Sequence, residues 1–384
     1  MRSRSTWLVL AALAALTLVL VPGAAGAEQS NRYIVVFKDF AAPQASPLAD
    51  ALAKRFGARS EQVFEYALKG FTVTLPPRLA ELLAADPRVA LVEADAEVTT
   101  MTTQTGATWG LDRIDQRSLP LSTTYSYANT GAGVKAYVID TGIRFDHSQF
   151  GGRAVTGYDA VDGGSADDCN GHGTHVAGTI GGSTYGVAKG VTLVGVRVLN
   201  CSGSGTTAGV IAGIDWVTGN HLPGQPAVAN MSLGGGASSA IDTAVRNSIA
   251  DGISYAIAAG NGNIFGMAED ACRKSPARVT EAMTIGATDS TDKKASWSNY
   301  GKCVDWFAPG VSITSAWYTS TTATNTISGT SMATPHTAGV AALYLQGNPG
   351  ASPASVRTAL FNNTTKSVVT SSRTTNNHLL FTNY

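Results

Sequence analysis

The most reactive side chains of this chain gather in the segment DDCNGHGTHVAG, residues 167–178. It holds two carboxylates, one cysteine and two histidines within nine positions. Such a cluster is typical either of a metal site or of a proton-transfer site. Zinc metalloproteases place their two histidines at positions i and i+4 with a glutamate between them. Here His172 and His175 stand three residues apart with Gly and Thr between them, so a zinc hydrolase is the weaker interpretation.

Two segments elsewhere in the chain add a carboxylate and a serine to His172: VIDTGI contains Asp140, and GTSMATPH contains Ser331. A serine hydroxyl attacks a carbonyl only when a base takes its proton, and the base needs a buried carboxylate to orient it. Taken singly, Asp140 or Ser331 is equally well read as a helix cap. Together with His172 they follow the order Asp…His…Ser, which subtilisin uses. An α/β-hydrolase is excluded, because its order differs and Ala333 stands where G-x-S-x-G requires glycine.

These three segments resemble the triad signatures of subtilisin-like serine proteases, and the resemblance extends over residues 109–345. TYGVAKGVTLVGVRVLNCSGSG and SWSNYG are similar to the proteinase K branch of that family. WGLDRIDQRSLPL and the placement of the cysteines resemble the aqualysin-type enzymes. Residues 32–98 resemble the inhibitor propeptide of the family. The resemblance implies a serine endopeptidase that is made as a zymogen and processed by its own activity.

The resemblance assigns a role to each catalytic residue. It implies that Ser331 is the nucleophile at the start of a helix, His172 the general base and acid, and Asp140 the group that orients His172. Asn261, in AAGNGN, would donate its side-chain amide to the oxyanion together with the backbone N–H of Ser331. A non-catalytic binding module on the same fold is the other alternative, but it usually requires a broken triad or oxyanion donor, and none is broken here.

An extended peptide substrate needs strand edges to bind, with pockets for alternate side chains. SLGGG (residues 232–236) resembles the segment that forms one such edge in the family. GSG (residues 203–205), which includes Gly203, resembles the segment that forms the opposite edge. The walls expected for the pocket of the residue before the scissile bond are formed by Ser232, Leu233, Gly234, Ala258, Ala259 and Gly260. Because these walls are small and uncharged, we predict broad cleavage after apolar or aromatic residues.

The four cysteines, Cys169, Cys201, Cys272 and Cys303, form an even number, which favours disulfides in an exported protein. Three pairings are possible from the sequence. The resemblance to the aqualysin-type enzymes implies that Cys169 pairs with Cys201 and Cys272 with Cys303.

Calcium is expected as a structural ion from the same resemblance, with two candidate sites. Hard oxygen ligands of this kind suit calcium better than a transition metal. The first site would use Asp305 with carbonyls near Thr280 and Ala282; the second would use Asp112, Asp115 and Gln116.

The elements that must position these residues fall into three parts. Residues 1–27 read as a secretory signal peptide, with a membrane anchor as the alternative. Residues 28–101 predict a small α+β unit with the ferredoxin-like order βαββαβ. A threonine-rich linker with a cleavage site near Met101/Thr102 follows it. In residues 102–384, apolar runs alternate with helical segments, which predicts an α/β, doubly wound, mostly parallel sheet flanked by helices.

Composition limits the partners of the chain. It carries 27 basic and 27 acidic residues, and this balance argues against a nucleic-acid partner. We expect a secreted, extracellular monomer with protein or peptide substrates, no membrane contact after signal removal, and its own propeptide as an intramolecular inhibitor. Asp167 and Asp168 read as solvated loop charges, and every histidine except His172 as a packing or surface residue.

Overall fold

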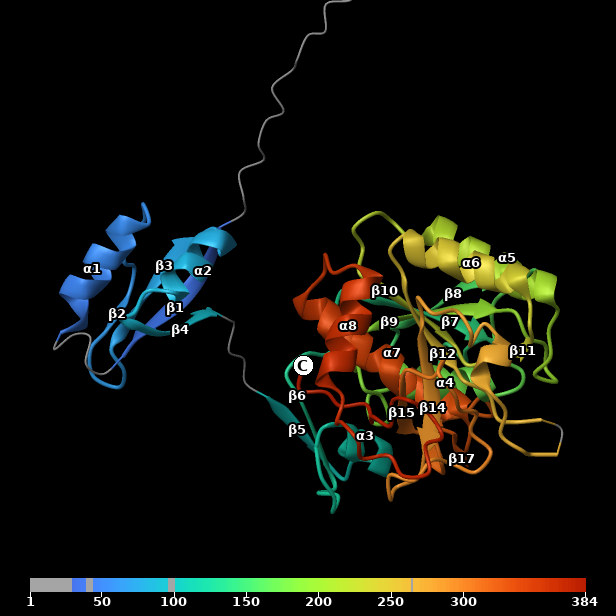
Figure 1. The fold of residues 1–384 in the computed structure, drawn as a ribbon. Coiled ribbons are helices and arrows are strands. Elements are labelled where there is room, and N and C mark those ends of the chain that lie inside the picture. Colours follow the sequence, from blue (N-terminus) through green and yellow to red (C-terminus); the bar gives the residue numbers. More distant parts are fainter. Residues whose placement is uncertain (1–29, 39–43, 96–100, 264) are drawn as a thin grey trace, which may run out of the picture. The chain divides into compact units, whose positions relative to one another are not determined.

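The computed structural model of the chain describes residues 30–38, 44–95, 101–263 and 265–384. The chain divides into two compact units, Met1–Val98 and Thr99–Tyr384 (Figure 1). The expected signal peptide, residues 1–27, lies outside the described residues. No helix in the described part of the chain combines the length and the apolar character needed to cross a membrane.

The first unit is a four-stranded antiparallel sheet with two helices. Its elements in chain order are β1 (Asn31–Phe37), α1 (Ala45–Arg55), β2 (Val63–Phe64), β3 (Gly70–Leu75), α2 (Pro77–Ala84) and β4 (Val89–Ala94). The strands lie in the order β2-β3-β1-β4. Val35 and Phe71 from the sheet pack with Leu52 and Leu83 from the helices, and all four side chains are buried. This is the βαββαβ order that the sequence predicts.

The second unit contains a seven-stranded sheet in which every neighbouring pair is parallel. The strand order is β15-β14-β12-β10-β7-β9-β8. The strands are β7 (Lys135–Asp140), β8 (Ala154–Asp159), β9 (Thr192–Arg197), β10 (Ala227–Met231), β12 (Ser254–Ala258), β14 (Met283–Thr288) and β15 (Trp306–Pro309). The chain builds β8 and β9 on one side of β7 and then returns to add β10 on the other side. The carboxyl ends of β7 and β10 therefore flank the point where the strand order reverses, which is where such sheets bind ligands.

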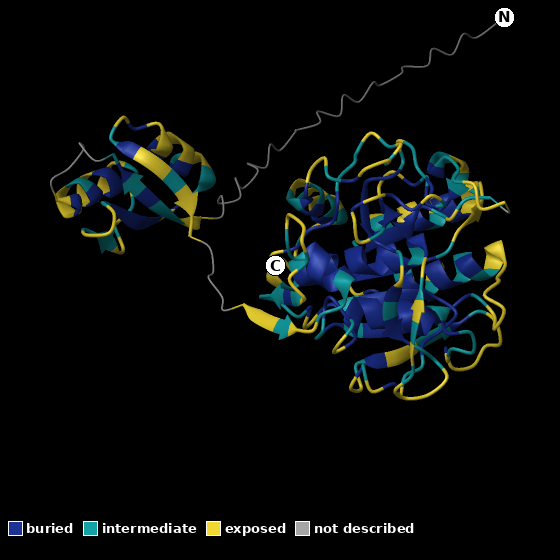
Figure 2. Ribbon diagram, turned by 90° about the horizontal axis from the view of Figure 1, so that it is seen from below, coloured by how far each residue is buried: buried dark blue, intermediate teal, exposed yellow. Residues whose placement is uncertain are grey.

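Helices cover both faces of this sheet. They are α4 (His172–Gly181), α5 (Thr207–Asn220), α6 (Ser239–Ala250), α7 (Thr330–Gly347) and α8 (Pro353–Asn363). In β7 the side chains alternate, so that Ala136 and Val138 pack in the core with α4 and α7, while Tyr137 and Ile139 pack in the core with α5 and α6. Figure 2 shows that the centre of the unit is formed by buried helices and strands. The doubly wound sheet confirms the predicted fold class.

Shorter elements complete the second unit. They are β5 (Thr102–Thr105), α3 (Trp109–Ile114), β6 (Thr124–Tyr127), β11 (Gly235–Gly236), the 3-10 helix η1 (Ala271–Arg273), β13 (Lys274–Ser275), β16 (Ile313–Ala316) and β17 (Thr324–Ile327). The expected threonine-rich linker is corrected here, because β5 pairs antiparallel with β6. Threonine is β-branched and suits an exposed strand as well as a linker.

Candidate active site

Asp140 is the last residue of β7 and is fully buried. Its Oδ1 atom lies 2.7 Å from Nδ1 of His172 and also accepts a hydrogen bond from the backbone N–H of Thr141 at 2.7 Å. Because Nδ1 faces a carboxylate, that nitrogen carries the proton of the neutral imidazole. The Nε2 atom of His172 therefore keeps its lone pair, as a general base requires.

His172 is the first residue of α4, and the loop before it is held by Asp168. The Asp168 carboxylate accepts hydrogen bonds from the backbone N–H groups of Asn170, Gly171 and Thr174, each at 2.9 Å. Helix starts leave such N–H groups without partners, and a carboxylate there satisfies them. The expectation that Asp168 is a solvated charge was wrong, whereas its neighbour Asp167 is exposed.

The charge around His172 favours its protonated form. Burial by itself lowers the pKa of His172, but the charge and hydrogen bond of Asp140, together with the charge of Asp168, outweigh burial, so the pKa lies above the ordinary value. A base with a raised pKa accepts a proton more readily, and the imidazolium that forms is stabilised in place.

Ser331 lies in the first turn of α7. Its hydroxyl donates to the backbone carbonyl of Ser232 at 3.0 Å. Among the residues described, no hydrogen bond joins Ser331 to His172. The two residues line adjoining cavities that share Leu233 and Gly234 as walls. Catalytic hydrogen bonds are often long or poorly aligned before substrate binds, so this absence does not exclude a Ser331–His172 pair.

The Ser331 backbone is held by a second contact with Ser232. Pro335 lies four residues further along α7 and has no N–H group to bond the carbonyl of Ser331. The hydroxyl of Ser232 takes that place and donates to this carbonyl at 2.8 Å. Asn230 in turn donates from Nδ2 to the Ser232 hydroxyl at 2.9 Å. The end of β10 therefore fixes the turn that carries Ser331.

Asn261 follows β12 and faces the start of α7. Its Oδ1 atom accepts from the backbone N–H and from the hydroxyl of Thr330, both at 2.8 Å. These bonds fix which way the amide points and leave Nδ2 as a donor. The Nδ2 atom lies 3.4 Å from the position that a Cβ would take at Gly329. Asn261 Nδ2 and the backbone N–H of Ser331 thus come from adjacent segments, as a pair of oxyanion donors must.

Two cavities lie along these residues. The larger, about 570 Å³, is lined by His172, Ser232 and Gly203 among others. The smaller, about 180 Å³, is lined by Ser331, Asn261 and the expected wall residues Leu233, Gly234, Ala258, Ala259 and Gly260. Lys274 also lines the smaller cavity, and it is a charged residue that the expected walls did not include. Sequence spacing did not point to Lys274, because the pairing of β13 with β11 brings it there.

Comparison with known proteins identifies the family. Residues 131–380 match the model of the Subtilase family (Peptidase S8), and residues 32–101 match Peptidase inhibitor I9. The chain belongs to the subtilases. As a member of this family of serine proteinases, it is a hydrolase that acts on peptide bonds, and it carries an inhibitor-type propeptide.

Curated relatives cover most of this subtilase. The "Extracellular serine proteinase" of Thermus sp. (strain Rt41A) is 62% identical over 328 residues, which are 85% of this chain and 78% of the relative. The "Alkaline serine exoprotease A" of Vibrio alginolyticus is 52% identical over 371 residues, 92% of this chain and 67% of the relative. The crystal structure of a cold adapted subtilisin-like serine proteinase matches with a TM-score of 0.69 and 57% identity, over 72% of this chain and 98% of that one.

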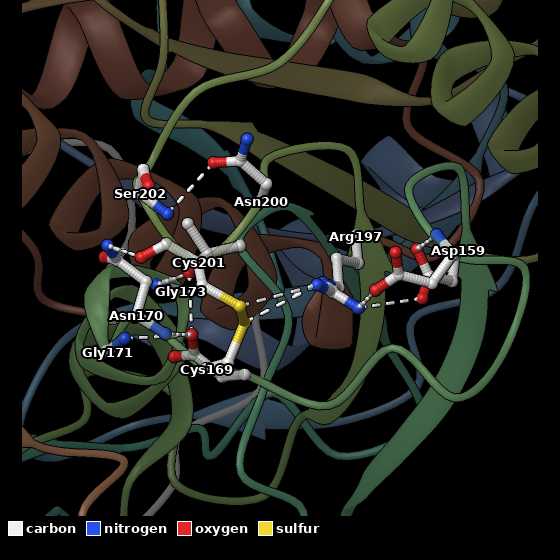
Figure 3. Close-up of a disulfide and its surroundings, with 12 residues drawn as sticks. Asp159, Cys169, Asn170, Gly171, Gly173, Arg197, Asn200, Cys201 and Ser202 are labelled. Atoms are coloured by element: carbon white, nitrogen blue, oxygen red, sulfur yellow. Dashed lines mark hydrogen bonds and ion pairs between the residues drawn. A yellow bond between two sulfur atoms is a disulfide. The ribbon is translucent and has the colours of Figure 1, made fainter.

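The subtilase has two disulfides, Cys169–Cys201 and Cys272–Cys303, which is the pairing that the resemblance implied. Cys169–Cys201 joins the loop before α4 to the loop after β9. Figure 3 shows Asn170 beside this bridge, where its Nδ2 donates to the carbonyl of Cys201 at 2.9 Å. The disulfide thus connects the segment that carries His172 to the segment that carries Gly203.

The other histidines of the subtilase have structural partners. His175 contacts the carbonyl of Ile313 at 3.0 Å, and burial lowers its pKa to about 4. Burial also lowers the pKa of His336 to about 4. Contacts within 3.5 Å from ring nitrogens are likewise made by His147, His221 and His378. Within the segment 167–178, Cys169 is bound in a disulfide and His175 contacts a backbone carbonyl. Of its two histidines, His172 is therefore the one placed for proton transfer.

The two expected calcium sites differ in how well the residues fit an ion. The Asp305 carboxylate already accepts a hydrogen bond from Arg357. It accepts another, at 2.8 Å, from the backbone N–H of Thr284, in the segment that follows Thr280 and Ala282. An ion at this site would therefore have to displace Arg357. Asp115 differs, because its Oδ1 atom is buried without a partner in the described structure.

Burial raises the pKa of Asp115 to about 6, and the neighbouring charge of Asp112 adds to this effect. Both oxygens of Asp112 accept from the loop of Ser122 and Thr123, and Gln116 donates to the carbonyls of Ser118 and Pro120. No group of three or more His, Cys, Asp or Glu side chains placed for a metal occurs among the residues that the structure describes. A calcium ion here would complete its shell with carbonyl oxygens and water.

Proposed function

We propose that this subtilase is a secreted serine endopeptidase that uses Asp140, His172 and Ser331 as its catalytic triad. The observation that carries the proposal is the 2.7 Å contact between Asp140 Oδ1 and His172 Nδ1 at the switch point of the sheet, with Ser331 at the start of α7. The names of the relatives support an extracellular location, as does the apolar leader of the sequence.

The first step is attack on the substrate carbonyl. The Ser331 hydroxyl turns from the Ser232 carbonyl toward Nε2 of His172, which takes the proton as oxygen bonds to carbon. Asp140 stays ionised and stabilises the imidazolium. His172 then gives the proton to the leaving amine, and an acyl-enzyme on Ser331 remains. Water, activated by His172, releases the acyl group and restores the enzyme.

The negative oxygen of each tetrahedral intermediate is bound by Asn261 Nδ2 and the N–H of Ser331. The amino end of α7 favours negative charge there. Loss of the side-chain donor reduces kcat by about 10²–10³-fold, a magnitude known from the corresponding asparagine of a subtilisin. The position of Asn261, fixed by Thr330, supports this role.

The substrate binds in extended form between the segments of residues 232–236 and 203–205. Its residue before the scissile bond enters the cavity of about 180 Å³. Leu233, Ala258 and Ala259 give this cavity apolar walls, which supports broad cleavage after apolar or aromatic residues. The balanced charge of the chain gives no support for nucleic acid as a partner, and we propose that the enzyme is a monomer.

The propeptide is removed by the enzyme's own activity at a site near Met101/Thr102. The Peptidase inhibitor I9 match and the start of β5 at Thr102 support this boundary. Calcium is proposed as a structural ion, with Asp115 and Asp112 as the carboxylates that fit it best.

Replacement of Ser331 by alanine tests the function. We expect Ser331→Ala to reduce turnover by about six orders of magnitude, the size known for loss of a subtilisin nucleophile. The variant should keep residues 28–100 attached when its mass is measured, because it cannot cut itself. A serine-directed phosphonate should label the wild type and inactivate it, whereas a zinc-selective chelator should not. Retained turnover in Ser331→Ala would contradict the proposal.

A further inference from the structure

The cavity beside Ser331 carries one ionisable side chain among its lining residues, Lys274. The other lining residues are apolar or neutral, and include Ala258, Ala277 and Asn299. When no other lining residue is charged, one cation strongly affects which substrate side chains the pocket binds, because no other lining charge offsets its field. Lys274 therefore bears on which substrate side chains this pocket accepts.

The backbone of Lys274 is held firmly against the cavity wall. Lys274 pairs with Gly236 and Ser275 with Gly235, and Gly235 itself lines the cavity. The Ser275 hydroxyl accepts from the N–H of Ser238 at 2.8 Å. The disulfide of Cys272 anchors the same segment two residues earlier. These contacts keep Lys274 at the wall in a fixed register.

The side chain of Lys274 is held by Glu269. Its Nζ atom lies 2.5 Å from Glu269 Oε2, and the two side chains are 29% and 33% exposed. The backbone N–H of Glu269 donates to Asn299 Oδ1 at 2.8 Å, and Asn299 lines the cavity. Glu269 itself is not among the lining residues. Lys274 thus lines the cavity, whereas Glu269, the partner of its ammonium, does not.

We propose that Lys274, positioned by Glu269, sets the charge preference of this pocket. Glutamate and glutamine before the scissile bond are accepted beside apolar residues, and lysine and arginine are disfavoured. The Lys274 ammonium has three N–H donors, so it can donate to a substrate carboxylate or amide while still bonded to Glu269. A substrate cation would instead meet a like charge, which costs affinity and disfavours the wrong substrate. This inference rests on the proposed endopeptidase function.

The test uses one peptide sequence with four different residues before the scissile bond: Leu, Gln, Glu and Lys. The measured quantity is the ratio of kcat/KM for the Glu peptide to that for the Lys peptide, with active enzyme counted by phosphonate titration. We expect the wild type to favour Glu. Lys274→Met should lower the ratio by about fivefold, the size of a partly exposed charge interaction. Lys274→Glu should reverse the preference, and Glu269→Gln should raise it.

The matched control is Arg273→Met, which removes the same charge from the neighbouring, exposed residue. It should leave the ratio as in the wild type. If Lys274→Met and Arg273→Met give the same ratio as the wild type, the inference is overturned. It is equally overturned if the wild type cleaves the Lys peptide better than the Glu peptide. Failure of the proposed function would look different, because Ser331→Ala would then still cleave the Leu peptide.

Discussion

The protonation state of His172 depends on carboxylates from two different elements. Asp140, at the end of β7, contacts it directly, whereas Asp168 acts from the loop that it also holds in place. Burial opposes both, and the net effect is a raised pKa. In the proposed mechanism His172 must be neutral to take a proton, so we expect activity to rise with pH as His172 loses its proton. The acidic side of the pH profile therefore reports on this group.

Removal of the Asp168 charge tests this dependence. A neutral residue stabilises the imidazolium less, so Asp168→Asn should lower the pKa of His172 and move the acidic limb of kcat/KM to lower pH. Asp167→Asn, a matched change at the exposed neighbour, should leave the limb in place. A limb that is unmoved in Asp168→Asn, or moved equally in both variants, would contradict the assigned role.

At this scale the sequence was enough to propose the catalytic groups, but not to predict their surroundings. Asp140, His172 and Ser331 stand in short motifs, so they could be found without a structure. Asp168 was misread because its acceptor role depends on where α4 begins and how the loop folds back on it. Lys274 was missed because the pairing of two-residue strands brings it to the cavity, and such pairing leaves no periodic signal.

The helix α7 is buried on nearly all sides and carries a proline in its second turn. An interior proline removes one helical hydrogen bond, and its ring crowds the carbonyl four residues earlier. In this helix that carbonyl belongs to Ser331, and the Ser232 hydroxyl bonds it instead. The proline thus makes the nucleophile's turn dependent on the end of β10.

A double-mutant cycle between Ser232 and Pro335 measures this dependence. Ser232→Ala leaves the Ser331 carbonyl without its donor, which should lower the free energy of unfolding by about 1–3 kcal/mol and reduce kcat. Pro335→Ala supplies a backbone N–H in the right place, so it should recover part of both losses in the Ser232→Ala background. Urea unfolding and initial rates give the coupling energy. Strictly additive effects would show that the two residues act independently.

The elements themselves follow largely from the sequence. Strands β7, β9, β10, β12 and β15 stand in near-continuous apolar runs, as strands buried on both faces do. The strands β8 and β14 and the helix α8 were not foreseen. In β8 (AVTGYD) exposed and buried residues are mixed, because it lies at the edge of the sheet. Such segments obtain their structure from neighbours, and local propensity alone does not reveal them.

On the scale of the whole molecule, the first unit was predicted with the correct order of elements, and the second with the correct fold class. The α/β sheet needs all of its strands before the site exists, since parallel pairing joins segments far apart in sequence. At Asp115 we propose that a calcium ion completes the stability of the fold. The raised pKa of Asp115 means that the folded state holds the proton more tightly than the unfolded chain, so without an ion its contribution to stability declines as the pH rises through about 6.

Calcium should reverse this loss. At pH 8 added calcium should raise the Tm of the mature enzyme, and a chelator should remove the gain. Asp115→Asn should abolish the calcium-dependent gain and raise the Tm in chelator, because the buried carboxylate oxygen without a partner no longer carries a charge. Asp305→Asn is the control, since Arg357 already occupies that carboxylate. A full calcium gain in Asp115→Asn would place the ion elsewhere.

The residues of the proposed site are brought together over long intervals of chain. Asp140 and His172 are 32 residues apart, and Ser232 and Ser331 are 99 apart. A nascent or partly folded copy of this protease therefore has no complete site with which to cut its neighbours. By the time the site is complete, the central strands and the helices that cover them are no longer free to bind as extended substrate. Completion of the sheet thus makes the molecule both able to digest proteins and resistant to digestion by its own copies.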